Sequence, residues 1–323
     1  MGGMLGFFVR QLTFTPKPLP QYVRLDGKTA IVTGANVGLG LEASKEMASH
    51  GLARVILGVR TVSKGEAAKQ EILKQSPDCD VQVWPVDHES FESIMAFGER
   101  AQSLDRLDIV ILCAGVKNLV FSLSKTGHEQ NVQVNHLGTS LLSLLMLKPL
   151  KDTATKTGSP SRLTIVASEV HFWTPFDERE APSILARLDE KGSFRGMERY
   201  NTSKLLNILW MRELSSRVTG NVVINAVNPG LCASALHRSD PTPGLAYLNK
   251  IFAWTPAQGG HNLTYAATQH VDEPGAYLTE QHLEKPSPFV LSTEGKTSQQ
   301  RIWDETIALF KEKVPNVDIE SGL

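Results

Sequence analysis

A glycine-bearing turn near the N-terminus limits what this chain of 323 residues can fold into. The segment 29–40 reads TAIVTGANVGLG, in which the apolar run AIV is typical of a buried strand and glycines follow at Gly34, Gly38 and Gly40. A helical pattern continues through about His50. Strand, glycine turn and helix in this order suit the phosphates of a dinucleotide, because glycine lets backbone N–H groups approach the pyrophosphate and the helix N-terminus adds partial positive charge. A tight turn without a ligand is the alternative.

The rest of the chain alternates short apolar runs with helical patterns. Buried strands that are regularly separated by helices are joined by βαβ crossovers. The sequence therefore predicts one α/β domain over 26–323, a Rossmann-type doubly wound parallel sheet with helices on both faces, preceded by an extended N-terminal arm over 1–25. The expected strands are 30–32, 54–59, 81–84, 107–112, 163–167 and 222–227, and the main helices are 41–50, 62–75, 91–102, 127–150, 197–218 and 302–313.

Two segments interrupt this alternation. Residues from about 169 to 197 are rich in proline, charge and aromatic side chains, and 232–252 contains two prolines. Both follow strands, and ligands of doubly wound sheets bind beyond the carboxyl ends of strands. They are either surface loops or the walls of a substrate pocket, for which Phe172, Trp173 and Phe176 offer apolar surface.

Composition narrows the class of partner. A net charge of −1 without a basic stretch gives no general attraction to nucleic acid, so a small-molecule partner is expected. The three cysteines form no close pair, which fits a reducing compartment, and a cytoplasmic location is expected. Neither cysteines nor histidines show the spacing of a metal site.

No apolar run reaches the roughly 18 residues of a membrane-spanning helix. The apolar start 1–8 and the TPKPLP of 15–20 predict an extended arm that packs over the domain, with a peripheral membrane contact as the alternative.

Four polar residues are candidates for chemistry. Tyr200 and Lys204 are four apart in a predicted helix and share one face, where a lysine cation favours the phenolate of a tyrosine whose ordinary pKa is ~10. Ser168 ends the fifth strand, where its hydroxyl either polarises a substrate carbonyl or caps a turn. Asn135 lies in a mostly apolar helix, where an asparagine can stabilise a kink.

With the glycine turn, these residues resemble the short-chain dehydrogenase/reductase family. The glycines match its Thr-Gly-x-x-x-Gly-x-Gly turn, and 228–230 (NPG) matches its Pro-Gly turn beside the nicotinamide. Within the family the chain is most similar to retinol dehydrogenase-like enzymes and related fungal reductases. The resemblance implies that Tyr200 is the general acid, Ser168 holds the substrate oxygen, Lys204 lowers the tyrosine pKa and grips the nicotinamide ribose, and Asn135 holds a proton-relay water.

Charge indicates which dinucleotide binds. NAD-selecting sheets place an acid at the end of the second strand, whereas this chain has Val59 there, Arg60 next to it and Lys64 a turn later. A guanidinium suits a 2′-phosphate, so NADP(H) is expected. By resemblance Asp87 contacts adenine, and Cys113 replaces an asparagine of the family. The expected cofactor residues are Gly34, Asn36, Gly38, Leu39, Gly40, Arg60, Lys64, Asp87, Cys113, Tyr200, Lys204, Cys232 and Ser234.

The resemblance implies an NADP(H)-dependent oxidoreductase that interconverts the carbonyl and alcohol of an apolar small molecule. We expect a carbonyl reductase of secondary, polyketide-type metabolism. The alternatives are a retinol-type alcohol dehydrogenase and a non-catalytic NADP-binding sensor or scaffold. The insertion 169–197 resembles the extra helix of monomeric carbonyl reductases, so a monomer is favoured over a dimer.

Overall fold

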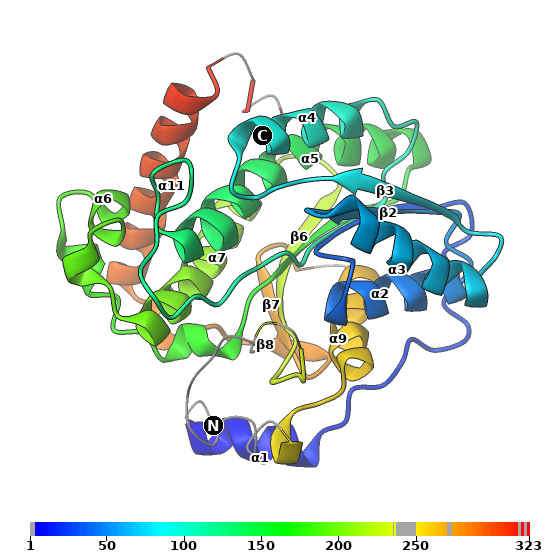
Figure 1. Cartoon of the computed structure of the whole chain (residues 1–323), viewed down its shortest axis with the longest axis horizontal. Coiled ribbons are helices and arrows are strands. Elements are labelled where there is room, and N and C mark those ends of the chain that lie inside the picture. The colour runs from blue at the N-terminus through cyan, green and yellow to red at the C-terminus, as the bar shows by residue number, and fades with distance from the viewer. Residues whose placement is uncertain (1–3, 235, 237–249, 270–272, 316–317, 320–321) are drawn as a thin grey trace.

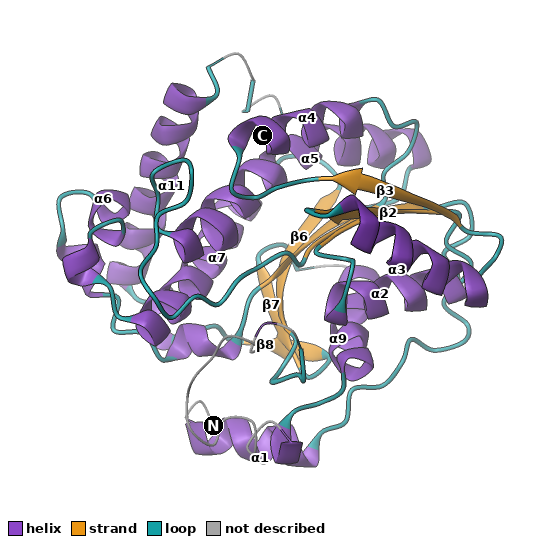
Figure 2. Cartoon of the chain, viewed as in Figure 1, coloured by secondary structure: helices purple, strands orange, loops and turns teal. Residues whose placement is uncertain are grey.

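The computed structural model describes residues 4–234, 236, 250–269, 273–315, 318–319 and 322–323. Their eight strands form one sheet in the order β3-β2-β1-β4-β5-β6-β7-β8, which lies between layers of helices (Figure 2). The strands are β1 Thr29–Thr33, β2 Arg54–Val59, β3 Asp80–Pro85, β4 Ile109–Leu112, β5 Ser161–Val166, β6 Val222–Asn228, β7 Ala276–Thr279 and β8 His282–Glu284.

The helices cover both faces of the sheet (Figure 1). The α-helices are α1 Met4–Thr13, α2 Gly38–Ser49, α3 Val62–Gln75, α4 Phe91–Gln102, α5 Gly138–Thr157, α6 Ile184–Leu188, α7 Gly196–Arg217, α9 Pro256–Thr268, α10 Pro288–Leu291 and α11 Thr293–Lys313. A π-helix, η1 Val132–Leu137, leads into α5, and short 3₁₀-helices are η2 Glu169–Phe172, η3 Asp177–Glu180 and η4 Lys191–Ser193.

A hydrophobic core lies on each face of the sheet, which explains why the central strands are short apolar runs in the sequence. Successive strand residues point to opposite faces. In β1, Ile31 packs into a core with α4, α5, α7 and α11, whereas Ala30 and Val32 pack into a second core with α2, α3 and α9. Because both faces are buried, apolar residues on successive positions dominate the central strands instead of alternating with polar ones. The predicted Rossmann-type, doubly wound fold is confirmed.

The far edge of the sheet was not predicted. β7 pairs parallel with β6, but β8 pairs antiparallel with β7, so the sheet is mostly rather than wholly parallel. The β7–β8 turn is built from Glu280 and Gln281 with φ of 46° and 58°. Hairpin turns with positive φ normally carry asparagine or glycine, so glutamate and glutamine at these positions do not indicate a hairpin.

The prediction of an extended N-terminal arm is wrong for 4–13, which form α1. Phe7 and Gln11, one helical turn apart, are both buried, so α1 packs one face on the domain. The segment that follows has no regular structure up to residue 20. It is anchored at the buried Leu19, whose backbone N–H donates to Glu46 Oε1 at 2.7 Å. Glu46 also pairs with His261 at 2.9 Å.

The insertion 169–197 folds into η2, η3, α6 and η4. Its α6 is held by Glu305 of α11, whose carboxylate accepts hydrogen bonds from the backbone N–H groups of Ile184 at 3.0 Å and Leu185 at 2.9 Å. The second interrupting segment, 232–252, lies largely outside the described residues.

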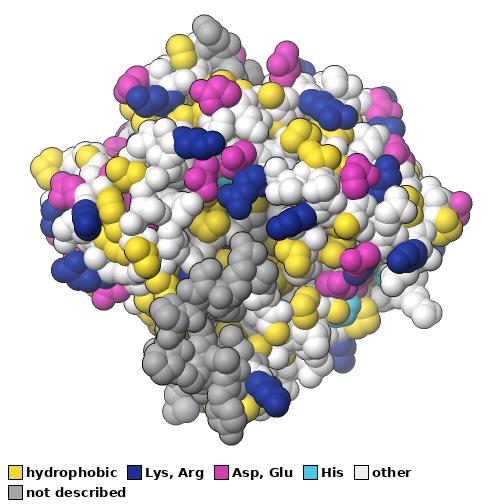
Figure 3. Space-filling model, in the orientation of Figure 1, with side chains coloured by type: hydrophobic (Ala, Val, Ile, Leu, Met, Phe, Trp, Pro, Cys, Tyr) yellow, Lys and Arg dark blue, Asp and Glu magenta, His cyan; other side chains and the backbone are white. Residues whose placement is uncertain are grey.

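Charges of both signs are interspersed on the face shown in Figure 3. Within the described ranges, no helix combines the length and the apolar character needed to cross a bilayer. The same residues contain no group of three or more His, Cys, Asp and Glu side chains that could hold a metal ion.

Candidate active site

The glycine turn lies where the strand order reverses, between β1 and β4. Gly34 has φ of +66°, and a Cβ on it would lie 2.9 Å from Ala114 Cα, so only glycine fits. Thr33 Oγ1 accepts hydrogen bonds from the backbone N–H groups of Cys113 at 3.0 Å and Ala114 at 3.1 Å. The turn is thereby fixed to the end of β4. A Cβ on Gly40 would lie 2.8 Å from the Gly34 carbonyl oxygen, which shows how tightly the turn closes.

The surroundings of this turn fit a dinucleotide. No side chain caps the N-terminus of α2, so its first N–H groups lack the side-chain acceptor that many helices carry. Asn36 and Leu39 are half-buried in the turn. A Cβ on Gly38 would lie 3.9 Å from Ser234 Cβ, and one on Gly259 would collide with both Leu39 and Cys232. The structure thus brings these predicted cofactor residues to one edge of the sheet.

The carboxyl end of β2 is followed by Arg60 and Lys64, and that of β3 by Asp87. Arg60 is 61% exposed, with Nη1 3.5 Å from Glu89 Oε1, and Lys64 is exposed in the first turn of α3. The half-buried Asp87 accepts a hydrogen bond from the Glu89 backbone N–H at 3.0 Å. Both cations therefore stand at the strand edge where a 2′-phosphate would be recognised, with Glu89 as the nearby competing anion.

Two cysteines line the same edge as neutral thiols. Burial raises the pKa of Cys113 to about 11, although Lys204 opposes the shift. Burial also raises the pKa of Cys232 to about 12, and its thiol donates to the Pro229 carbonyl at 3.4 Å. Both can contribute packing and backbone contacts, but not the amide hydrogen bonds of an asparagine.

Tyr200 and Lys204 lie on one face of α7 and are both buried. Lys204 Nζ donates a hydrogen bond to the Val166 carbonyl of β5 at 3.0 Å. A Cβ on Gly115 would lie 3.7 Å from Lys204 Nζ and 3.2 Å from Asn135 Oδ1, so these groups meet at one point. The ammonium is thus fixed between the ends of β4 and β5.

Burial controls the protonation of this pair. It lowers the pKa of Lys204 to about 8. It raises the pKa of Tyr200 above its ordinary value. The expected lowering of the tyrosine pKa by Lys204 is therefore not found in this structure, where removal of the phenolate from water is the cause of the shift. At neutral pH Tyr200 holds its proton.

Asn135 lies within the π-helix η1, so the predicted helix 127–150 is interrupted where the asparagine stands. Its amide donates to the Val116 carbonyl and to Ser203 Oγ, both at 2.9 Å, and accepts from the Val116 N–H at 2.8 Å. Both side-chain donors are therefore used inside the protein, and the side chain joins the segment after β4 to α7.

Ser168 lies two residues beyond the end of β5 and is half-buried. Its Oγ accepts a hydrogen bond from the Val170 N–H at 3.3 Å and so caps η2. Ser168 therefore caps a turn, and this bond uses its oxygen only as an acceptor. Since η2 packs against α7, it also carries the serine toward the helix of Tyr200.

The sequence did not single out Lys117. Its Nζ lies 5.9 Å from the centre of the Tyr200 ring, which places a second cation beside the phenol. No motif marks this residue, because its position depends on the path of the chain after β4.

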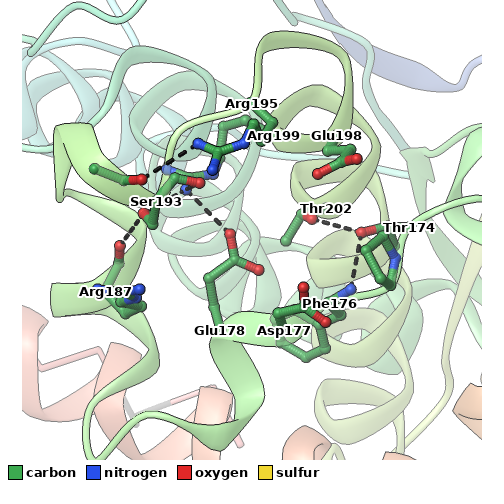
Figure 4. Close-up of a pocket in the computed structure, with 12 residues that line it drawn as sticks. Thr174, Phe176, Asp177, Glu178, Arg187, Ser193, Arg195, Glu198, Arg199 and Thr202 are labelled. Atoms are coloured by element: carbon green, nitrogen blue, oxygen red, sulfur yellow. Dashed lines mark hydrogen bonds and ion pairs between the residues drawn. The ribbon is translucent and has the colours of Figure 1, made fainter.

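The insertion also holds a polar cavity of about 180 Å³ (Figure 4). Arg199 points from α7 to Glu178 across it, with Nη2 3.0 Å from Oε1. The cavity is lined by neither Ser168, Tyr200 nor Lys204, so it is separate from their site.

Two aromatic side chains of the insertion pack on different parts of the fold. The ring centre of Phe176 lies 5.9 Å from that of Phe289, whereas the ring centre of Trp173 lies 5.5 Å from that of Phe7 of α1.

A doubly wound sheet with a glycine turn at its switch point and a buried tyrosine–lysine pair nearby defines a dinucleotide-binding oxidoreductase. A family model described as short chain dehydrogenase matches residues 28–169. The chain is 96% identical over 285 residues to short chain dehydrogenase sol3 of Alternaria solani, covering 88% of this chain and 100% of that protein. It is 34% identical to short chain dehydrogenase/reductase dmxR8 of Cryptosporiopsis sp., covering 97% and 99%. The chain belongs to the short-chain dehydrogenase/reductase family.

Solved structures agree with the fold. A protein of Mycobacterium paratuberculosis superposes with a TM-score of 0.69 at 23% identity, covering 93% of this chain and 97% of that one. A Shigella flexneri 2a short chain dehydrogenase, crystallised with NADP, superposes with a TM-score of 0.60 at 20% identity, covering 81% and 100%. At these identities the likeness shows the fold alone.

Proposed function

We propose that this oxidoreductase uses NADPH to reduce the carbonyl group of an apolar small molecule in fungal secondary metabolism of the polyketide type. The observation that carries the proposal is the geometry of Tyr200 and Lys204, which are buried on one face of α7 with the Lys204 ammonium fixed on the Val166 carbonyl. A phenol beside the carbonyl oxygen can donate its proton as that oxygen gains negative charge. The similarity to fungal short chain dehydrogenases supports the metabolic setting.

In the proposed reaction, NADPH supplies a hydride to the carbonyl carbon. Ser168 donates a hydrogen bond to the carbonyl oxygen, and Tyr200 gives that oxygen its phenolic proton, so that C=O becomes CH–OH. Lys204 holds a ribose hydroxyl and balances the phenolate left on Tyr200. The phenolate would regain a proton from solvent by way of the Lys204 ammonium. Asn135 would orient a relay water only through its amide oxygen, since both of its side-chain donors are used.

The test is NADPH oxidation, followed by absorbance, with a panel of apolar aldehydes and ketones. Turnover of one of them supports the proposal. Turnover only of alcohols with the oxidised cofactor would replace it with the retinol-type dehydrogenase. Tight NADPH binding without turnover in either direction would favour a sensor or scaffold.

The proposed choice of NADPH depends on Arg60. Arg60→Ala is expected to raise the KM for NADPH by roughly 10- to 100-fold, because a charge-assisted hydrogen bond to the 2′-phosphate is lost. The KM for NADH, which lacks that phosphate, is expected to stay within about 2-fold, since only the 2′-phosphate uses the guanidinium. Arg24→Ala, at an exposed arginine paired with Asp26, is the control. Equal effects of Arg60→Ala on both cofactors would contradict the assignment.

A further inference from the structure

The N-terminal helix α1 lies against the carboxyl-end loops of β5 and β7. Arg10 of α1 places Nη2 2.5 Å from Glu169 Oε1 and Nε 3.3 Å from Glu280 Oε2. The two carboxylate side chains are only 5% and 3% exposed. One guanidinium therefore pairs with two buried carboxylates that follow different strands at the same end of the sheet, and burial of either carboxylate as an anion would cost more free energy without it.

Glu169 connects this ion-pair cluster to the reacting groups. It directly follows Ser168, and its backbone N–H donates to Asn228 Oδ1 at 3.1 Å. The same oxygen accepts from the Gly230 N–H at 3.1 Å. Asn228 thus joins the loop of Ser168 to the Pro-Gly turn at the end of β6, and Arg10 holds the side chain of Glu169 at this junction.

Gln11, the next residue of α1, is hydrogen-bonded to the backbone of Leu231, which directly follows the Pro-Gly turn. Its side chain donates to the Leu231 carbonyl at 2.8 Å and accepts from the Leu231 N–H at 3.2 Å. Its backbone carbonyl accepts a hydrogen bond from Trp254 Nε1 at 3.0 Å. A Cβ on Gly230 would lie 2.6 Å from Trp254 Cε3 and 3.1 Å from Gln11 Oε1, so the turn is enclosed by these two residues.

Aromatic side chains fill the space beside these polar contacts. Phe7 packs edge-on against Trp173 of the insertion with the ring centres 5.5 Å apart, and Phe8 packs on Phe252 with the ring centres 4.9 Å apart. Trp173 belongs to the segment that follows β5, and Phe252 to the segment that follows β6. Together α1, Trp173 and Phe252 form an apolar wall at the substrate end of the sheet.

We infer that α1 orders two loops of the active site: Arg10 is a positioning residue that holds the Ser168 loop, and Gln11 holds the Pro-Gly turn. The inference rests on the proposed function for its effect on turnover. Its effect on the two loops is independent of any activity.

The test compares Arg10→Met with Arg10→Lys in the full chain, and uses Arg24→Met, at the exposed pair with Asp26, as the matched control. Hydrogen–deuterium exchange is measured over 168–173 and 228–232 in protein without ligand. Arg10→Met is expected to speed exchange in both segments and to lower kcat/KM for the carbonyl substrate by roughly 10- to 100-fold, because the reacting groups lose their alignment. The Kd for NADPH is expected to change by less than about 3-fold, as the glycine turn is untouched. Arg10→Lys is expected to restore most of the exchange protection.

Unchanged exchange in both segments relative to Arg24→Met would overturn the inference. If Arg10→Met does not fold, Gln11→Ala is judged by the same criterion at 228–232. Failure of the wild-type protein to turn over any carbonyl would refute the proposed function, whereas the exchange data would still decide whether α1 orders the two loops.

Discussion

Tyr200→Phe is expected to lower kcat for carbonyl reduction by roughly 10²- to 10⁴-fold, the range that a positioned general acid contributes. The substitution removes one hydroxyl and leaves the ring, which is 5% exposed, in its packing. The pKa of Tyr200 is raised by burial, so the wild-type acid stays protonated across neutral pH and the lost group is the proton donor itself. Stopped-flow or steady-state oxidation of NADPH measures the effect.

The design separates chemistry from binding. NADPH affinity of Tyr200→Phe, followed by quenching of tryptophan fluorescence, is expected to match that of the wild type within about 5-fold, because one neutral hydrogen bond contributes about 1 kcal/mol to binding. Tyr265→Phe, at a tyrosine on α9, is the matched control and is expected to retain full activity. A Tyr200→Phe enzyme with more than a tenth of wild-type turnover would show that another group donates the proton.

Lys204→Met is expected to abolish turnover and, at the same time, to stabilise the protein. Burial lowers the pKa of Lys204 to about 8 in the folded chain, below its ordinary 10.5. The unfolded chain therefore binds this proton more tightly, and below pH 8 the buried charge costs up to ~3 kcal/mol of folding free energy. Methionine fills similar space without a charge. The catalytic loss is expected to exceed roughly 100-fold, since the cation that balances the phenolate is gone.

The way the Tm difference between Lys204→Met and the wild type changes with pH tests whether the buried charge of Lys204 is what destabilises the wild type. Because the penalty is full below pH 8 and vanishes as pH rises through 10.5, the gain in Tm of Lys204→Met over the wild type is expected to be larger at pH 7 than at pH 9.5. Lys74→Met, at an exposed lysine on α3, is expected to change Tm little at either pH. A lower Tm for Lys204→Met at pH 7 would mean that its hydrogen bond to Val166 outweighs the desolvation of the charge.

Features set by neighbouring residues could be predicted from the sequence. The six strands β1 to β6 were recognised because burial on both faces gives them short runs of consecutive apolar residues. The glycine turn was recognised because its backbone needs the φ of Gly34. Tyr200 and Lys204 share a face of α7 through helix geometry alone. These are local rules, so one sequence suffices to apply them.

Features that depend on distant contacts could not be predicted. The role of Arg10 depends on Glu169, which is far away in the sequence, and Asn135 depends on Val116 and Ser203. The pKa of Tyr200 depends on how completely the fold removes water from its hydroxyl, and this reversed the expected direction of the shift. Spacing identifies which groups meet, whereas burial decides their protonation.

The anchor at Leu19 has a consequence for how α1 behaves when its contacts break. Only residues 14–18 lie between the end of α1 and Leu19, which Glu46 holds on α2. A chain of this length spans less than ~20 Å even when fully extended. A detached helix would therefore stay at a local concentration in the millimolar range and would return by a first-order step that does not depend on protein concentration. A free peptide with the sequence of α1 would displace it only at millimolar levels or above.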